Sequence, residues 1–220
     1  MFDEALLEKF IQSYEAGDTI FSESEPGHEM YIIKSGRVKV IRNKDSEEQL
    51  LSILGPGSSF GEMALIEAKP RSATVMAVEK TEVLMVTYTD LEQVLSSKPE
   101  FLFKLIQVFC RRIRFTTCQI ENYAIKSPFG RAADLLTMLV EDGNFYPNQE
   151  TFRLGVNAAD ISQMAGLKLE EVGPILEKFV LDGLIRIDEG QLGQLVIVTN
   201  LNGLKNARGF YLNKDNMGTK

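Results

Sequence analysis

Residues 19–87 consist of short stretches in which apolar and polar residues alternate, and turn residues separate these stretches. Such alternation is the pattern of a half-buried β-strand. Several short strands at regular spacing indicate a β-barrel or sandwich. The predicted strands are 19–21, 30–33, 38–41, 50–54, 73–78 and 83–86, with turns near 35–36, 43–45 and 55–57 and a short amphipathic helix ahead of them at 4–13.

A different kind of segment, FGEMALIEAKPRSATV at 60–75, interrupts this pattern. It begins with a predicted single turn of helix, whose unpaired backbone N–H groups attract anions. Gly61 permits a close approach of the backbone to a ligand, and Arg71 can donate in a bidentate manner to phosphate oxygens. Ser72 adds two donors, and Glu62 is an acceptor suited to a sugar hydroxyl. Together they indicate a site for a nucleotide phosphate and its ribose.

This segment resembles the phosphate-binding cassette of cyclic-nucleotide-binding domains, and the chain to about residue 200 resembles the Crp/Fnr family of bacterial transcription regulators. The resemblance implies that Glu62 meets the ribose 2′-hydroxyl, Arg71 meets the cyclic phosphate, and Ser72 supports that contact. The implied effector is cAMP or a related cyclic nucleotide, with no metal, haem or iron–sulfur cluster. The alternative is an ordinary barrel turn with a surface arginine. The segment's implied nucleotide-binding residues are Gly61, Glu62, Met63, Ala64, Arg71 and Ser72.

In the family the barrel has the shape called a double-stranded β-roll. The resemblance also implies that apolar residues inside this roll form a wall against the nucleotide base. Val40, Ser52 and Leu54 are placed near that wall. For each of these residues taken singly, a plain core position is an equally good interpretation.

Residues 99–127 predict one long helix with two apolar rows. One row alternates four and three residues apart, which is a heptad seam. The second row serves to pack the helix on its own barrel, so the seam favours a parallel homodimer. The seam residues are Leu102, Ile106, Phe109, Ile113, Thr116, Ile120 and Tyr123, and the second row is Phe101, Leu105 and Val108.

Two adjacent threonines, Thr116 and Thr117, lie at or beside this seam. Buried hydroxyls need hydrogen-bond partners. The resemblance implies that they bind the nucleotide base across the dimer. The alternative is that they bond back to carbonyl groups of their own helix.

The sequence after a predicted hinge at 127–130 indicates a winged helix. Asn157 is expected to cap a helix over 158–165, Gly166 turns the chain, and a second helix runs to about 181 before a hairpin. The whole chain is therefore expected to be an α+β protein. Its predicted domains are a cyclic-nucleotide-binding β-roll at 1–98, a long dimerisation helix at 99–127, and a winged helix-turn-helix domain at 128–220 with a polar, frayed tail from 201.

The predicted DNA-reading helix departs from the family pattern. Leu169 and Pro174 stand where the family has arginines, although Glu170 matches and Lys168 and Lys178 are further candidates for DNA contact. Arginine bound to guanine is the commonest specific base contact. Proline inside a helix is unfavourable, so we expect the helix to begin late, near residue 173. Residues 130–220 hold nine basic and twelve acidic side chains, whereas affinity for DNA depends largely on cations.

The composition of the chain argues against several classes of function. The two cysteines are too few for an iron–sulfur cluster, and a single histidine argues against a cupin-type metal site. No nucleophile–base pair is evident, so no enzyme activity is expected. The absence of a long apolar run or signal-peptide pattern predicts a cytoplasmic protein without a membrane partner.

Two functions follow. The first is a cAMP-responsive homodimeric transcription regulator that binds DNA. The second keeps the nucleotide and the dimer but uses the C-terminal module to bind protein partners. The formal charge of −7 favours the second, and the resemblance favours the first.

Overall fold

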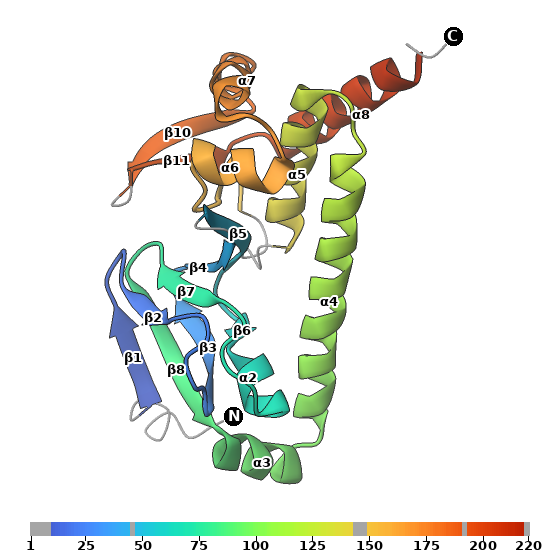
Figure 1. Ribbon diagram of the computed structural model, residues 1–220. Helices are drawn as coiled ribbons and strands as arrows, with labels where there is room; N and C mark the ends of the chain where they lie inside the picture. The colour runs from blue at the N-terminus through green and yellow to red at the C-terminus, as the bar shows by residue number, and fades with distance from the viewer. Residues whose placement is uncertain (1–9, 45–46, 143–148, 191–192, 218–220) are drawn as a thin grey trace. The chain divides into compact units, whose positions relative to one another are not determined.

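The computed structural model describes residues 10–44, 47–142, 149–190 and 193–217 (Figure 1). The chain forms two compact units, residues 1–111 and 112–220. The division falls within the long helix α4 (Glu100–Tyr123), which contributes to both units. Each unit is described by itself.

The described residues of the first unit form a roll of two four-stranded antiparallel sheets, as the resemblance implied. One sheet has the strand order β1-β8-β3-β6 and the other β2-β7-β4-β5. The strands are β1 (Ile11–Tyr14), β2 (Thr19–Phe21), β3 (Glu29–Ser35), β4 (Val38–Lys44), β5 (Glu47–Leu54), β6 (Ser59–Phe60), β7 (Thr74–Ala77) and β8 (Thr81–Thr87). All six predicted strands are confirmed, because alternation fixes which side chains enter the core.

The helix predicted over residues 4–13 is wrong where the structure describes it. Strand β1 begins at Ile11 and pairs antiparallel with β8, with Ile11 opposite Leu84 and Tyr14 opposite Thr81. Residues 4–9 lie outside the described part of the chain. The available edge of β8 satisfies the backbone groups of β1, and this long-range pairing overrides the local apolar spacing.

Aromatic rings form the centre of the roll. Phe21, Tyr31 and Phe60 stack with ring centroids 5.2 to 5.9 Å apart, and Val38 and Val75 pack into the same cluster. Aromatic pairs at this spacing stabilise beyond their buried area. The cluster therefore holds strands from both sheets together.

In the described part of this unit, three helices contribute wholly or partly. They are α2 (Glu62–Glu67), α3 (Tyr88–Ser97) and the first half of α4. Thr87 caps α3, because its hydroxyl and the Asp90 carboxylate form a reciprocal capping box. Leu105 of α4 is buried against the roll, as the second apolar row predicted.

The second unit is a winged helix. It contains α5 (Pro128–Asp142), β9 (Phe152–Arg153), α6 (Ala158–Ala165), α7 (Leu169–Leu181), β10 (Ile185–Gly190), β11 (Gly193–Val198) and α8 (Leu201–Met217), and its sheet has the order β10-β11-β9. Asn157 caps α6 in a capping box with Asp160, as predicted. Gly166 ends α6 with a φ of 59°, which lets the chain turn into α7.

The expectation that the second helix of this motif begins late is wrong. Helix α7 starts at Leu169 and contains Pro174 in its interior. The backbone N–H of Lys168 donates to Glu171 Oε2 at 2.9 Å, which fixes the first turn. Val172 and Phe179 are fully buried on the inner face, and their burial outweighs the hydrogen bond that the proline removes.

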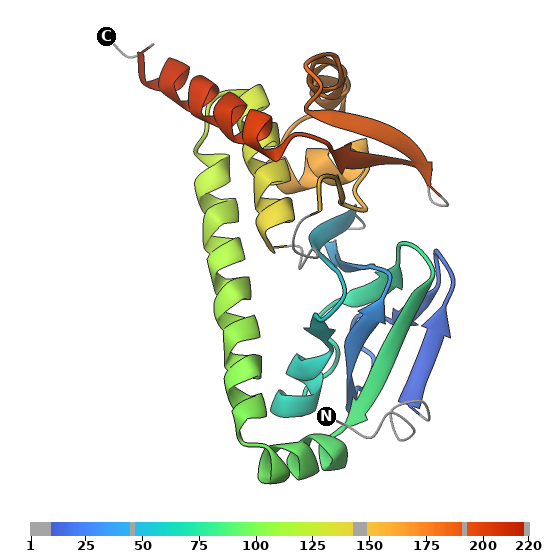
Figure 2. The same ribbon diagram turned by 180° about the vertical axis from the view of Figure 1, so that it is seen from behind.

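The expectation of a frayed tail is also wrong. Residues from Leu201 to Met217 form helix α8, which lies along α5 in both views (Figure 1 and Figure 2). Leu204 is completely buried, and the Tyr211 ring stacks on Phe129 with centroids 5.4 Å apart. The sparse apolar residues of this segment gain their stability from α5, a neighbour that is distant in sequence.

Candidate nucleotide-binding site

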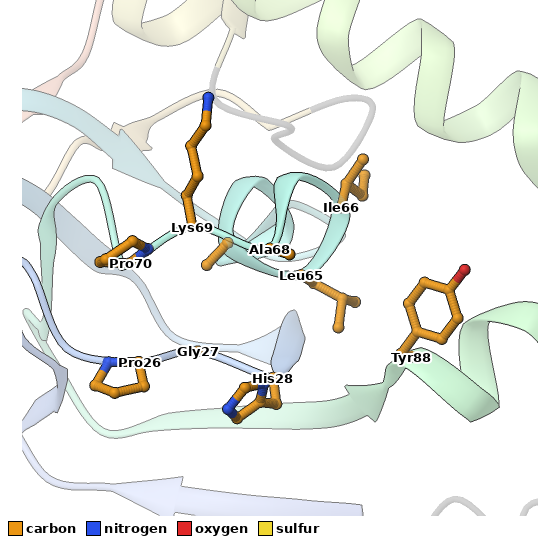
Figure 3. Close-up of a pocket in the computed structure, with 10 residues that line it drawn as sticks. Pro26, Gly27, His28, Leu65, Ile66, Ala68, Lys69, Pro70 and Tyr88 are labelled. Carbon is orange, nitrogen blue, oxygen red and sulfur yellow. The ribbon is translucent and has the colours of Figure 1, made fainter.

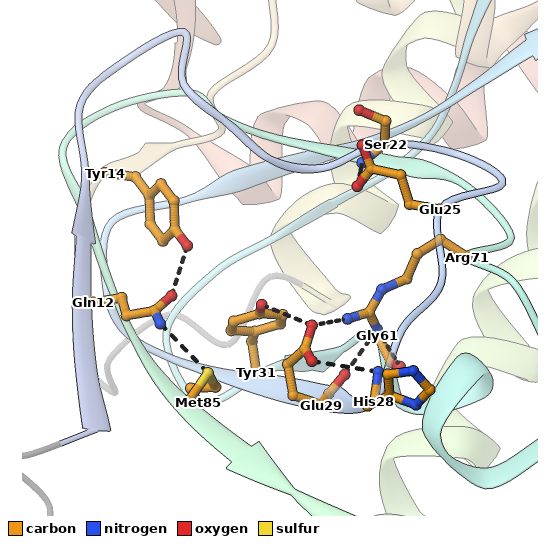
Figure 4. A network of polar contacts seen from close by, with 10 residues as sticks. All are labelled: Gln12, Tyr14, Ser22, Glu25, His28, Glu29, Tyr31, Gly61, Arg71 and Met85. Atoms are coloured by element: carbon orange, nitrogen blue, oxygen red, sulfur yellow. Dashed lines mark hydrogen bonds and ion pairs between the residues drawn. The ribbon is translucent and has the colours of Figure 1, made fainter. Parts of the chain in front are cut away.

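Arg71 lies at the centre of the predicted nucleotide site (Figure 4). Its side chain is buried, with 3% of the residue exposed. Nη1 donates to the carbonyl oxygens of Glu29 (2.7 Å) and Gly61 (2.9 Å), and Nη2 forms an ion pair with Glu29 Oε1. The guanidinium is therefore held by the protein's own acceptors on two of its three nitrogens.

Aromatic rings form one wall around this guanidinium. Its central carbon lies 4.1 Å from the ring centroid of Phe21 and 5.9 Å from that of Tyr31. A cation over an aromatic face is attracted by the negative face of the ring. The Tyr31 hydroxyl also donates to Glu29 Oε1 at 3.1 Å. Burial raises the pKa of the Tyr31 phenol, and the Glu29 carboxylate raises it further.

Two glycines let the backbone close around Arg71. Gly61 caps α2 with a φ of 79°, and a Cβ at this position would lie 2.8 Å from Nη1. A Cβ on Gly27 would overlap Nε and the central guanidinium carbon. The backbone N–H of Arg71 donates to the backbone carbonyl oxygen of Glu25 at 2.8 Å, which ties the loop containing Gly27 to the arginine. Any side chain at either glycine would displace the guanidinium.

The structure brings most of the predicted phosphate cassette together. Glu62 opens α2 and is buried, with 2% exposure. Ala64 is buried behind it, whereas Met63 is half exposed. The Ser72 hydroxyl is exposed and donates to the Met63 sulfur at 3.6 Å. Arg71, Glu62 and the first turn of α2 thus form one cluster.

A pocket of about 630 Å³ adjoins the cassette (Figure 3). Such a volume is typical of small-molecule sites. Of the predicted nucleotide residues only Ala64 lines it, and Gly27 lies between this pocket and the guanidinium. Its lining residues are Pro26, Gly27, His28, Ala64, Leu65, Ile66, Ala68, Lys69, Pro70 and Tyr88.

The residues predicted for the base wall lie on the second sheet. Val40 pairs with Ser52 on one side and Val75 on the other, and Leu54 is buried in the aromatic cluster of the roll. Val40 packs against that same cluster, and Ser52 is half-buried. These positions face the roll interior, which suits both a base wall and plain core.

The two threonines of α4 lie in the second unit. Thr117 Oγ1 donates to the carbonyl oxygen of Ile113 at 3.0 Å. This is a hydrogen bond within its own helix, the alternative to a contact with the nucleotide base. Thr116 is exposed. Along the predicted seam Ile113 and Ile120 are 68% and 67% exposed, so these apolar side chains are available to a partner.

The predicted DNA-contacting residues are all exposed, but carboxylates accompany the lysines. Lys168 Nζ lies 3.8 Å from Glu170, and Lys178 Nζ lies 2.6 Å from Asp182. The hydrogen bond and charge of Asp182 raise the pKa of Lys178. Leu169, at the start of α7, is 57% exposed. The outer face of α7 therefore presents little uncompensated positive charge.

Sequence reasoning missed Glu29, Gly27, Phe21 and Tyr31, which surround Arg71. Glu29 opens a strand and is separated from Arg71 by 42 positions, so no local pattern pointed to it. Among the described residues no group of histidine, cysteine and carboxylate side chains could hold a metal ion. In the same part of the chain, every helix is too short or too polar to cross a bilayer.

Known proteins resemble the chain over nearly its whole length. The model of the cyclic nucleotide-binding domain matches residues 11–98. The CRP-like cAMP-activated global transcriptional regulator of Mycobacterium tuberculosis is 30% identical over 203 residues, covering 89% of this chain and 88% of that protein. The cAMP-activated global transcriptional regulator CRP of Salmonella typhimurium is 29% identical over 169 residues, covering 76% and 80%.

Solved structures show the same fold. FixK2 from Bradyrhizobium japonicum superposes with a TM-score of 0.70 at 21% identity, covering 90% of this chain and 96% of that one. A transcriptional regulator of the CRP/FNR family from Thermus thermophilus superposes with a TM-score of 0.67 at 22% identity, covering 90% and 98%.

Proposed function

The chain belongs to the Crp/Fnr family of transcription regulators, and we propose that it is a homodimeric regulator whose effector is a cyclic nucleotide, cAMP foremost. It carries a cyclic nucleotide-binding domain, and the two curated relatives named above are transcriptional regulators. The observation that carries the proposal is the clustering of Arg71, Glu62 and the glycine-capped start of α2.

Each member of this cluster has a chemical role. Arg71 binds the cyclic phosphate, because a guanidinium is a permanent cation that matches phosphate geometry. Ser72 and the first N–H groups of α2, beginning at Glu62, supply further donors to the phosphate. The Glu62 carboxylate accepts from the ribose 2′-hydroxyl. The base lies along Val40 and the neighbouring wall residues of the roll.

The dimer forms along the exposed seam of α4. Leu102, Ile106, Ile113, Ile120 and Tyr123 are each about half exposed or more, and their heptad spacing is that of a parallel coiled coil. Burying them against a second copy removes this apolar surface from water. In the dimer Thr116 and Thr117 reach the base of the bound nucleotide.

The output is binding to DNA through the winged helix. A second candidate output, binding to a protein partner, has its own support. Glu170 and Glu177 are exposed on the outer side of α7, and both predicted lysines have a carboxylate nearby. Phosphate contacts supply most of the affinity for DNA, so this surface favours a weak DNA binder or a protein partner.

Calorimetry tests the effector. The wild type is expected to bind cAMP. Arg71→Ala is expected to lower the affinity for cAMP at least about a hundredfold, which corresponds to about 2.7 kcal/mol of binding free energy. Thr116→Ala is the matched variant that tests base recognition. It is expected to weaken the binding of cAMP more than the binding of cGMP. Unchanged cAMP affinity in Arg71→Ala would contradict the assigned site.

Fluorescence anisotropy with random duplex DNA separates the two outputs. If the winged helix binds DNA, affinity is measurable at low salt with cAMP present and falls as salt rises. A complete lack of binding at low salt would leave the protein-partner output.

A further inference from the structure

The Glu29 carboxylate is bound to Arg71, the residue proposed to bind the ligand phosphate. Its Oε1 atom accepts from both Arg71 Nη2 and the Tyr31 hydroxyl, and its Oε2 atom accepts from the backbone N–H of His28 at 3.3 Å (Figure 4). The Arg71 side chain is 1% exposed in this arrangement. The guanidinium is therefore closed off from a ligand that arrives from solvent.

The charges around Arg71 make simultaneous binding unfavourable. One guanidinium already has the Glu29 carboxylate on it, and Glu62 is buried at the start of α2. Adding a phosphate while Glu29 stays in place would put another negative charge beside the same cation in a poorly solvated site. Glu29 has a route out, because its side chain is 28% exposed whereas Arg71 is not.

We propose that Glu29 competes with the ligand phosphate for Arg71 and thereby sets the affinity and the charge of the nucleotides that the site accepts. This inference rests on the proposed function. A cyclic phosphodiester carries one negative charge and replaces one carboxylate on the guanidinium. A linear nucleotide monophosphate carries nearly two negative charges at neutral pH. It is therefore repelled more strongly by the Glu29 carboxylate, which stays nearby after it is displaced. Glu29 thus favours cyclic over linear monophosphates.

The test compares binding of cAMP and 5′-AMP by calorimetry to the full-length wild type and to Glu29→Gln. Glutamine keeps the size and the hydrogen-bond acceptor but removes the competing charge. We expect cAMP to bind about tenfold tighter to Glu29→Gln, and 5′-AMP to gain more than cAMP. The matched control is Glu25→Gln, because this exposed carboxylate in the same loop accepts from the Ser22 N–H, and that hydrogen bond lowers its pKa more than the charge of Arg71 does. It is expected to change either affinity less than about twofold.

A second variant guards against misfolding of the first. Tyr31→Phe removes only the hydroxyl that holds the Glu29 carboxylate, so it is expected to tighten cAMP binding about twofold to threefold. Circular dichroism at the working temperature checks that each variant is folded.

The outcomes distinguish the two proposals. Tighter binding by Glu29→Gln, including binding that appears only in this variant, supports the competition. If the wild type binds cAMP and Glu29→Gln binds it equally or more weakly, Glu29 only positions Arg71 and the competition is overturned, while the proposed effector stands. If neither protein binds any cyclic nucleotide, the proposed effector fails and the inference fails with it.

Discussion

The Asp134 carboxylate links three helices of the second unit and offers a sharp test of how α8 is held. Asp134 of α5 has a side chain that is 5% exposed. Its Oδ1 atom lies 2.6 Å from Nε of Arg208 on α8, and its Oδ2 atom accepts from Nδ2 of Asn122 on α4 at 2.8 Å. Arg208→Met would leave a buried carboxylate without its cation.

The expected loss follows from burial. Removing one partner of a buried ion pair costs about 3–5 kcal/mol. Arg208 is 44% exposed, so water can replace part of its interaction, and the Asn122 hydrogen bond persists. We therefore expect Arg208→Met to destabilise the packing of α8 on α5 by about 2 kcal/mol. The matched control is Lys205→Met, which removes an exposed pair with Glu141 at 2.8 Å and should cost about 0.5 kcal/mol or less.

Hydrogen exchange measured by mass spectrometry reports this local stability. Peptides from α5 and α8 should exchange about thirtyfold faster in Arg208→Met and less than about threefold faster in Lys205→Met. Adding Asp134→Asn to Arg208→Met removes the buried charge and should restore most of the protection. Equal effects of the two single variants, or no restoration in the double variant, would refute the role assigned to Asp134.

Two further predictions concern stability. Gly209→Ala should stabilise α8 by about 0.5–1 kcal/mol, because a Cβ there meets no atom within 4 Å beyond its chain neighbours and the backbone of its own helix, and alanine loses less entropy on folding; a lower urea midpoint would contradict this. Tyr31 should ionise after an exposed tyrosine in an alkaline absorbance titration. Its raised folded pKa gives stability that is fully present below about pH 10 and is lost as pH rises through the folded value. Tyr31→Phe should remove the late step, and an unchanged titration curve would disprove the assignment.

Local patterns in the sequence were enough to predict much of the fold. Alternation in residues 19–87 predicted the strands, because the side-chain period of two determines which residues enter the core. The resemblance of residues 60–75 to a phosphate-binding cassette was recognisable because the glycine, the carboxylate and the arginine lie within one short segment. The capping of α6 by Asn157 and the turn at Gly166 were likewise local.

Contacts between distant segments decided the rest. The edge of β8 made β1 a strand, burial of Val172 and Phe179 kept Pro174 inside a helix, and docking on α5 ordered α8. The partner of Arg71 was equally hidden, because Glu29 reaches it only after β3 and the cassette are brought together. The sequence alone indicated which groups are candidates for binding a nucleotide. Only the tertiary structure decided that one of them is already bound to a carboxylate, because such a pairing depends on distance in space and not on spacing in the chain.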